Sequence, residues 1–193
     1  MTRPGEARLR RASPSEQRAK RAEVDDPEQV LAAALRFIEV RQRSVAEVRQ
    51  RLTRAGYRQE LIAAALVRLA DLGILDDEAF TAAWVESRDR ARPRGERALR
   101  RELALKGVDR SVIDAAMRER RPQPGVAGDP DQQAAEQLLA RHATALARIP
   151  DVRRRRERAY ALLARNGFDV DTSARLAARV SEPPAAEPRS TDL

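Results

Sequence analysis

The chain has 193 residues and a formal net charge of +8, and it contains no cysteine. The lack of cysteine excludes disulfides, thiolate metal sites and cysteine nucleophiles, and no apolar run approaches the about 20 residues that span a bilayer. Apolar residues account for 42% of the chain but aromatic residues for only 3%, which favours helices packed through Ala, Leu, Val and Ile over a sheet.

Residues 1–26 are predicted to form a disordered basic arm, because they are polar and interrupted by Pro4, Gly5 and Pro14. The arm lacks the apolar stretch of a signal peptide, so we expect a cytoplasmic location without membrane association. Its positive charge would attract polyanions such as nucleic acids, although a GC-rich gene would also enrich arginine and alanine.

Helix starts recur along the rest of the chain. Asp26 and Asp129 each precede a proline and are predicted N-caps, and Ser44 with Glu47 forms a capping box. The first helix of each of three units is expected over residues 28–43, 77–92 and 130–147. The third helices of the first two units are expected over residues 59–72 and 111–121.

Three glycines, Gly56, Gly107 and Gly167, are predicted to end helices at the C′ position. When they are aligned, apolar residues recur four and eight positions before each glycine and directly after it, which predicts one face of a repeated helix. We therefore expect an all-α fold of three tandem three-helix repeats forming an elongated curved solenoid. The alternative is an ordinary helical bundle in which the glycine stops are coincidental.

The expected domain boundaries follow from these signals. The segments are a disordered basic arm (1–26), repeat 1 (27–76), repeat 2 (77–121), a linker rich in Pro and Gly (122–129), repeat 3 (130–180) and a disordered tail (181–193). A solenoid with capped ends is compatible with a monomer, which is the oligomeric state expected.

Positive charge is concentrated in two segments of the predicted repeats. The candidate partner- or DNA-binding residues are Arg88, Arg90, Arg92, Arg94, Arg97, Arg100, Arg101, Arg153, Arg154 and Arg156. Arg94, Arg97 and Arg101 are expected on one helix face, and the turn at residues 93–95 is expected to form part of an anion site at a helix start. The alternative is a solvated face balanced by pairs such as Glu96–Arg100.

Other candidates favour structural roles. Asp76 and Asp77 could bind a metal, but adjacent carboxylates at a helix start usually cap it. Phe80 and Trp84 could stack on bases, but as the large residues of repeat 2 they are expected in its core. The chain has one histidine and no glycine-rich nucleotide-binding motif, so we expect neither an enzyme nor a cofactor.

Residues 69–88, LADLGILDDEAFTAAWVESR, resemble the signature of the RecX family. In that signature a helix ends in Leu-Gly-Tyr-Leu-Asp-Asp, and an acidic residue and Phe then open a helix carrying Trp-Val and Arg; Ile74 replaces the tyrosine here. The resemblance is strong over residues 28–120 and weak over 130–180. It continues at Arg94-Gly95, at ALRREL (98–103) and at Lys106-Gly107-Val108, and upstream at Ser44, Glu47, Leu52 and Gly56-Tyr57.

The resemblance implies a protein of three helical repeats that binds along the groove of the RecA–DNA filament. There it would suppress strand exchange, ATP turnover and assisted repressor cleavage, as a regulator in recombination, DNA repair and the SOS response. Weak contact with single- and double-stranded DNA is also expected. Two alternatives stay open: a helix-turn-helix-like nucleic-acid-binding protein acting mainly through phosphate contacts, and a protein-interaction scaffold without DNA contact.

Overall fold

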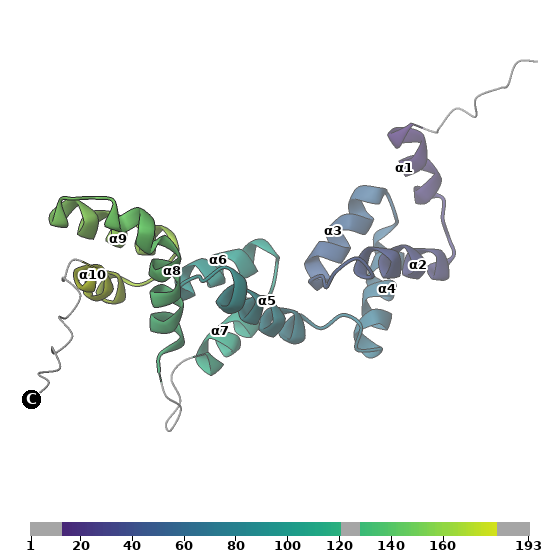
Figure 1. The fold of residues 1–193 in the computed structure, drawn as a ribbon. Helices are drawn as coiled ribbons and strands as arrows, with labels where there is room; N and C mark the ends of the chain where they lie inside the picture. Colours follow the sequence, from purple (N-terminus) through teal and green to yellow (C-terminus); the bar gives the residue numbers. More distant parts are fainter. Residues whose placement is uncertain (1–12, 121–127, 181–193) are drawn as a thin grey trace, which may run out of the picture. The chain divides into compact units, whose positions relative to one another are not determined.

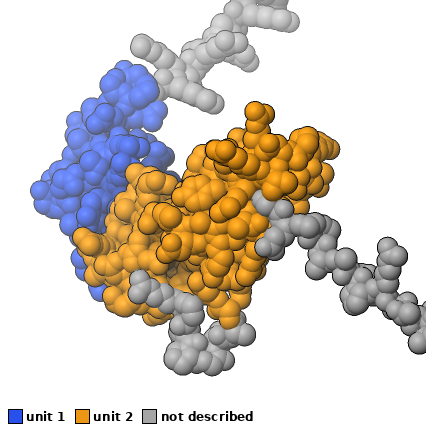
Figure 2. All heavy atoms as spheres, turned by 90° about the vertical axis from the view of Figure 1, so that its left-hand side faces the viewer, with its two compact units in different colours: residues 1–76 blue, residues 77–193 orange. Residues whose placement is uncertain are grey.

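The computed structural model describes residues 13–120 and 128–180, and all of the regular secondary structure in these ranges is α-helical (Figure 1). The chain divides into two compact units, residues 1–76 and residues 77–193 (Figure 2). The first twelve residues of the predicted arm, most of the predicted linker and the predicted tail lie outside the described residues. Among the described helices, none combines the length and the apolar character that crossing a membrane requires.

The first unit contains one helical repeat preceded by a short helix. Its helices are α1 (Pro14–Ala22), α2 (Pro27–Ile38), α3 (Val45–Ala55) and α4 (Gln59–Asp71). Helices α2, α3 and α4 pack on one another, and α1 packs on α3. The core of the repeat consists of aliphatic side chains that are at most 1% exposed, namely Val30, Ala34, Val48, Leu52, Ile62 and Leu69.

The second unit contains two further repeats. The helices of the first are α5 (Asp77–Ala91), α6 (Glu96–Leu105) and α7 (Arg110–Glu119), and those of the second are α8 (Pro130–Ala147), α9 (Val152–Arg165) and α10 (Val170–Arg179). Each triplet has its own buried cluster, centred on Leu99 and Leu103 in one and on Leu163 and Phe168 in the other. The prediction of an all-helical fold built from repeated three-helix modules is confirmed.

The ends of the middle helices repeat in detail. Gly56, Gly107 and Gly167 all have positive φ, at 101°, 73° and 86°. In each case the residue after the glycine donates its N–H to the carbonyl five residues back, from Tyr57 to Leu52, from Val108 to Leu103 and from Phe168 to Leu163, at 3.2–3.3 Å. This is the Schellman end of a helix, so the three glycines have the same role in the backbone and do not end helices by coincidence.

The predicted helix starts are confirmed as well. Ser44 and Glu47 form the capping box of α3, and Asp26 and Asp129 cap α2 and α8, each of which has proline in its first turn. The first helix of repeat 1 ends at Ile38, five residues earlier than the predicted end.

The prediction of a disordered arm was wrong for residues 14–22, which form α1. Ser13 accepts from the N–H of Glu16 at 3.2 Å, and Glu16 accepts from the N–H of Ser13 at 2.7 Å. This is the same capping box that identified α3, followed by proline at the first helical position. The capping signal was therefore present in the sequence. The helix was not predicted because α1 has no apolar face, and none of its residues is buried.

Candidate functional site

The predicted basic segment 88–101 runs from the end of α5 through a turn into α6, and its arginines have different environments. The Nε of Arg88 donates to Glu102 Oε2 at 2.7 Å, and its guanidinium lies over the Trp84 ring at 4.1 Å from the centroid. Trp84 also donates its indole N–H to Glu102 at 3.0 Å. Arg88 therefore belongs to an internal cluster that joins α5 to α6.

Arg94 and Arg100 are also held by partners within the unit. Arg94 pairs with Glu102 at 3.4 Å and hydrogen-bonds to Asn166. The prediction that Arg94 shares one helix face with Arg97 and Arg101 was therefore wrong. Arg100 donates to Glu96 at 2.7 Å and to Asp114. Its hydrogen bond to Asp114 raises the pKa of Arg100 and lowers the pKa of the Asp114 carboxyl. The predicted alternative of a Glu96–Arg100 pair is thus present.

Arg120 is a structural arginine that the sequence did not single out. Its guanidinium bonds to both Asp89 oxygens, at 2.8 and 3.1 Å, and to Asp131, and its side chain is only 9% exposed. Burial alone would lower the pKa of Arg120, but its hydrogen bonds to Asp89 and Asp131 raise it above the ordinary value. Burial raises the pKa of Asp131. Because the partners lie 31 and 11 residues away, no local pattern marks this link between α5, α7 and α8.

The turn at residues 93–95 was predicted to form part of an anion site at the start of α6, and the structure corrects this. The N–H of Glu96 donates to the carboxylate of Asp131 at 3.2 Å. The N–H groups of Gly95 and Arg97 donate to the carbonyls of Asn166 and Gly167, at 3.0 and 3.2 Å. These acceptors come from repeat 3, so the donors of the helix start are satisfied inside the second unit.

Two glycines permit this contact between repeats 2 and 3. A Cβ added to Gly95 would lie 2.4 Å from backbone atoms of Gly167 and Phe168, and a Cβ added to Gly167 would lie 2.4 Å from the backbone nitrogen of Ala98. Both glycines are buried. The end of α9 therefore meets the start of α6 backbone to backbone, at a distance that only glycine allows.

The outer face of α6 carries the remaining positive charge of this helix. Arg97 and Arg101 are exposed, and neither side chain forms an ion pair or a hydrogen bond with any residue the structure describes. Leu105, one turn further on, is 82% exposed. We call these three residues, spaced four apart, the α6 stripe. Arg92, directly after α5, is also exposed and its side chain is unpaired within the described ranges, whereas Arg90 pairs with Glu86.

The second predicted basic segment forms most of α9. Arg153 pairs with Glu157 at 3.1 Å, and both side chains are largely exposed. The side chains of Arg154 and Arg156 are exposed and form no ion pair or hydrogen bond within 13–120 and 128–180. Arg155 instead donates to the carbonyl of Ile149 at 2.9 Å and so holds the turn before α9. The arginines are spread around the helix and do not form a single face.

The aromatic and acidic candidates lie in the core of repeat 2, beside cationic side chains or at a helix start. Phe80 is 4% exposed in the core of repeat 2, as expected, whereas Trp84 is only partly buried. Arg88 and Lys106 both lie over the Trp84 ring, at 4.1 and 5.0 Å, so the ring has cationic neighbours of its own. Helix α5 begins at Asp77. Within the part of the chain that the structure describes, no cluster of three or more His, Asp or Glu side chains could hold a metal ion.

Comparison with protein families matches two of the three helical modules. The model described as "RecX, first three-helix domain" matches residues 31–69, and the model described as "RecX, second three-helix domain" matches residues 76–117. These ranges correspond to α2–α4 and to α5–α7, the modules that the resemblance in sequence identified.

Individual proteins extend the match. Regulatory protein RecX of Mycolicibacterium vanbaalenii is 40% identical over 112 residues, which cover 58% of this chain and 58% of that protein. Regulatory protein RecX of Mycobacterium avium is 35% identical over 141 residues, 73% of this chain and 78% of that protein. The matched region thus spans little more than half the length of the first relative and over three quarters of the second.

Solved structures share the fold. The crystal structure of RecX from Lactobacillus salivarius has a TM-score of 0.64 and 19% sequence identity, with 81% of this chain and 97% of that chain covered. A second structure, described as the crystal structure of regulatory protein RecX, has a TM-score of 0.61 and 21% identity, with 82% of this chain and 70% of that chain covered. Taken with the two module matches and the 35% identity to the Mycobacterium avium protein, these findings show that the chain belongs to the RecX family of regulatory proteins.

Proposed function

We propose that this chain is a non-enzymatic regulator that binds the RecA–DNA filament and inhibits RecA's ATP hydrolysis, strand exchange and co-protease activity. Family membership supports a regulatory role, and the name of the family points to the RecA system as its target. The protein would act as a monomer in the cytoplasm, laying its repeats along the filament groove.

The α6 stripe is the observation that carries this proposal. Four of the seven arginines between residues 88 and 101 are paired with acidic residues of the same unit. Arg97 and Arg101 are left exposed and without such partners among the described residues, and Leu105 adds an apolar side chain beside them. Arginine next to exposed apolar area is typical of the centre of a protein interface. The stripe would meet an acidic surface on the filament.

The direct test is ATP hydrolysis by RecA on single-stranded DNA, measured with increasing amounts of this protein. We expect hydrolysis to fall as the protein is added. A large excess of bare double-stranded DNA distinguishes two causes, because inhibition directed at the filament survives the competitor whereas sequestration of DNA does not. Hydrolysis that stays unchanged at saturating protein would contradict the proposal.

Helix α9 supports an accessory function in DNA binding through phosphates. Arg153, Arg154 and Arg156 are largely exposed. Arg153 and Arg156, three residues apart, share one side of the helix and Arg154 lies on another, which suits diffuse contact with a charged backbone better than a shaped protein interface. The third helices α4 and α7 contain a single Asn or Gln between them, Gln59, and its amide bonds to Thr53 at 3.3 Å. That composition favours phosphate contacts over base readout by a helix-turn-helix unit.

Binding of labelled single-stranded DNA across a salt series tests this accessory function. If Arg154 and Arg156 each contact a phosphate, replacing both with Ala should reduce the slope of log affinity against log salt by about 1.4. The control replaces the exposed Arg110 and Arg118 of α7. A slope that stays at the wild-type value in the α9 variant would exclude these residues from DNA contact.

A further inference from the structure

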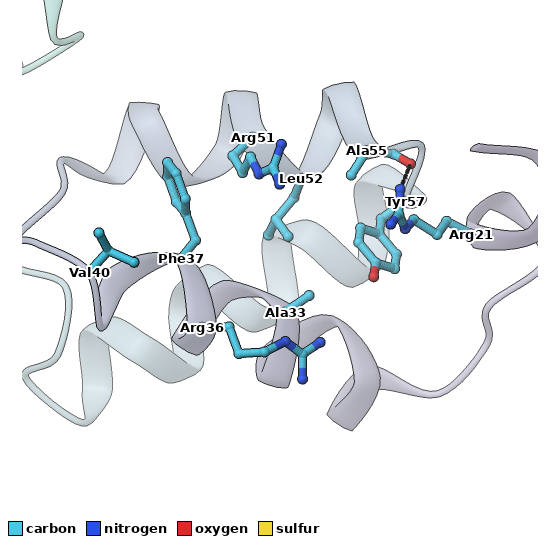
Figure 3. A pocket seen from close by; sticks show the side chains of 9 residues that line it. All are labelled: Arg21, Ala33, Arg36, Phe37, Val40, Arg51, Leu52, Ala55 and Tyr57. Atoms are coloured by element: carbon cyan, nitrogen blue, oxygen red, sulfur yellow. Dashed lines mark hydrogen bonds between the residues drawn. The ribbon is translucent and has the colours of Figure 1, made fainter. Parts of the chain in front are cut away.

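A hollow in the first unit gathers positive charge from three helices (Figure 3). Arg21 from α1, Arg36 from α2 and Arg51 from α3 line it, together with Phe37 and Tyr57. Its volume is about 330 Å³, which is within the range of pockets that hold small ligands. The three arginines lie in separate elements, so the fold and not the local sequence brings them to one place.

Helix α1 completes this hollow, and its position depends on Gly56. A Cβ added to Gly56 would lie 2.8 Å from the carbonyl oxygen of Arg18, so the backbone of α1 passes directly over the end of α3. From there Arg21 reaches the carbonyl of Ala55, to which it donates at 3.5 Å. The positive φ of Gly56 and this close approach both exclude larger residues.

The charge of the hollow is not balanced from within. None of the nine lining residues is acidic. The side chain of Arg36 is exposed and makes no ion pair or hydrogen bond with the described residues. The guanidinium of Arg51 lies 5.7 Å from the centroid of the Phe37 ring, and that of Arg43 lies 4.1 Å from the same centroid. The site therefore presents guanidinium groups that lack a counter-charge at close range.

We propose that this hollow binds a phosphate group. A carboxylate is flat and is matched by one guanidinium in a bidentate pair, whereas the oxygens of a phosphate point in tetrahedral directions and can accept from several arginines at once. Arginines from three helices line different sides of the hollow, so they can donate to a phosphate from more than one direction. The phosphate would come either from a nucleic-acid backbone or from a free nucleotide, and the adjoining Val40, which is 78% exposed, offers an apolar surface for the attached sugar.

This site lies in the first unit, whereas the α6 stripe and α9 lie in the second. The proposal is independent of any action on RecA, and its test contains no RecA. The phosphate-site proposal can therefore fail while the proposed function stands, and the proposed function can fail while the phosphate site is real.

The test is an NMR titration of the isotope-labelled full chain, observed at the amides of Gly56 and Tyr57 beside the hollow. The probes are inorganic phosphate, thymidine monophosphate, a twelve-residue oligothymidine and an oligoglutamate of equal charge. The variant R36A/R51A removes two of the three guanidiniums, and R36A alone removes a side chain that has no structural partner among the described residues. The matched control is R49A/R68A, which removes two exposed arginines that do not line the hollow.

We expect the phosphate-bearing probes to shift both amide signals, with at least a fivefold weaker affinity in R36A and in R36A/R51A and no change in the control. Comparable shifts with thymidine monophosphate and oligothymidine would show that a free nucleotide is sufficient for binding. Shifts with oligothymidine alone would identify the backbone of a nucleic-acid strand as the source of the phosphate. Three results would each overturn the proposal: an affinity in R36A/R51A equal to that of the wild type, amide signals that no probe shifts, or tighter binding of oligoglutamate than of oligothymidine.

Discussion

The two faces of α6 carry arginines with opposite surroundings, although the sequence places them side by side. On the inner side, Arg100 bonds to Glu96 and Asp114, and the start of the helix is joined to repeat 3 through Gly95. On the outer side, Arg101 is exposed and has no such partner in the described ranges. A run of arginines is therefore not one functional unit, because each side chain takes its role from the carboxylates within its reach.

The same difference separates the cluster around Arg120 from the α6 stripe. Arg120 is 9% exposed between two aspartates, where its charge contributes to the joint between repeats 2 and 3. Arg97 is exposed to solvent and contributes to a surface. Substitutions on the inner side should lower stability, and substitutions on the outer side should lower binding without loss of stability.

The largest loss of stability is expected from Gly167→Ala, which breaks the inner contact. The new Cβ would lie 2.4 Å from the backbone of Ala98, and the residue has a φ of 86°. Left-handed strain and overpacking together should lower the free energy of unfolding by about 2–5 kcal/mol. Urea unfolding followed by Trp84 fluorescence measures this, because the chain's single tryptophan lies in the same unit.

Gly107→Ala is the matched control for that variant. Gly107 has a φ of 73° in the same kind of helix end, but it is exposed. Its substitution should cost only the backbone strain, about 1–2 kcal/mol. Equal losses in the two variants would show that the close approach of α9 to α6 does not contribute to stability.

Arg120→Ala should have the next largest effect on the same measurement. It leaves Asp131, whose side chain is 17% exposed, and the less buried Asp89 without their shared cation. Removing one partner of a fully buried ion pair costs about 3–5 kcal/mol, and we expect about 2–4 kcal/mol here because the Asp89 side chain is 34% exposed. Arg118→Ala, at an exposed position two residues away, should change the free energy of unfolding by less than about 0.5 kcal/mol. A similarly small change in the free energy of unfolding of both variants would mean that the Arg120 cluster does not stabilise the contact between repeats 2 and 3.

The smallest stability difference is expected between two adjacent residues, Arg100 and Arg101. The Arg100 side chain is 33% exposed, so its two ion pairs are screened and Arg100→Ala should cost about 0.5–1 kcal/mol. Arg101→Ala should leave the free energy of unfolding unchanged within error. The comparison would fail if Arg101→Ala were the more destabilising of the two.

Local signals in the sequence predicted most of the fold. The capping box at Ser44, the Asp-Pro helix starts and the three glycines each depend on a few neighbouring residues, and the structure has all of them. Helix α1 carried the same capping signal at Ser13, but its lack of a buried face concealed it. The end of α2 was predicted too late, since Val40, although apolar, is 78% exposed and lies beyond the helix.

The candidate site was predictable only as a region. Charge density identified residues 88–101, and the four-residue spacing placed Arg97 and Arg101 on one face of α6. Which of these arginines are neutralised depends on carboxylates such as Glu102 and Asp114, which lie 14 residues beyond Arg88 and Arg100 and reach them only after the helices pack. For the same reason, no local pattern could place Arg21, Arg36 and Arg51 around one hollow.

The most direct test of the α6 stripe as the surface that binds the filament is RecA ATP hydrolysis in the presence of R97E/R101E. The control is R49E/R68E, which changes the net charge equally at two exposed arginines of the first unit. Reversing two interface charges should raise the concentration needed for half-maximal inhibition at least tenfold, equivalent to about 1.4 kcal/mol, while the control inhibits like the wild type. Equal inhibition by R97E/R101E and the wild-type protein would contradict the account.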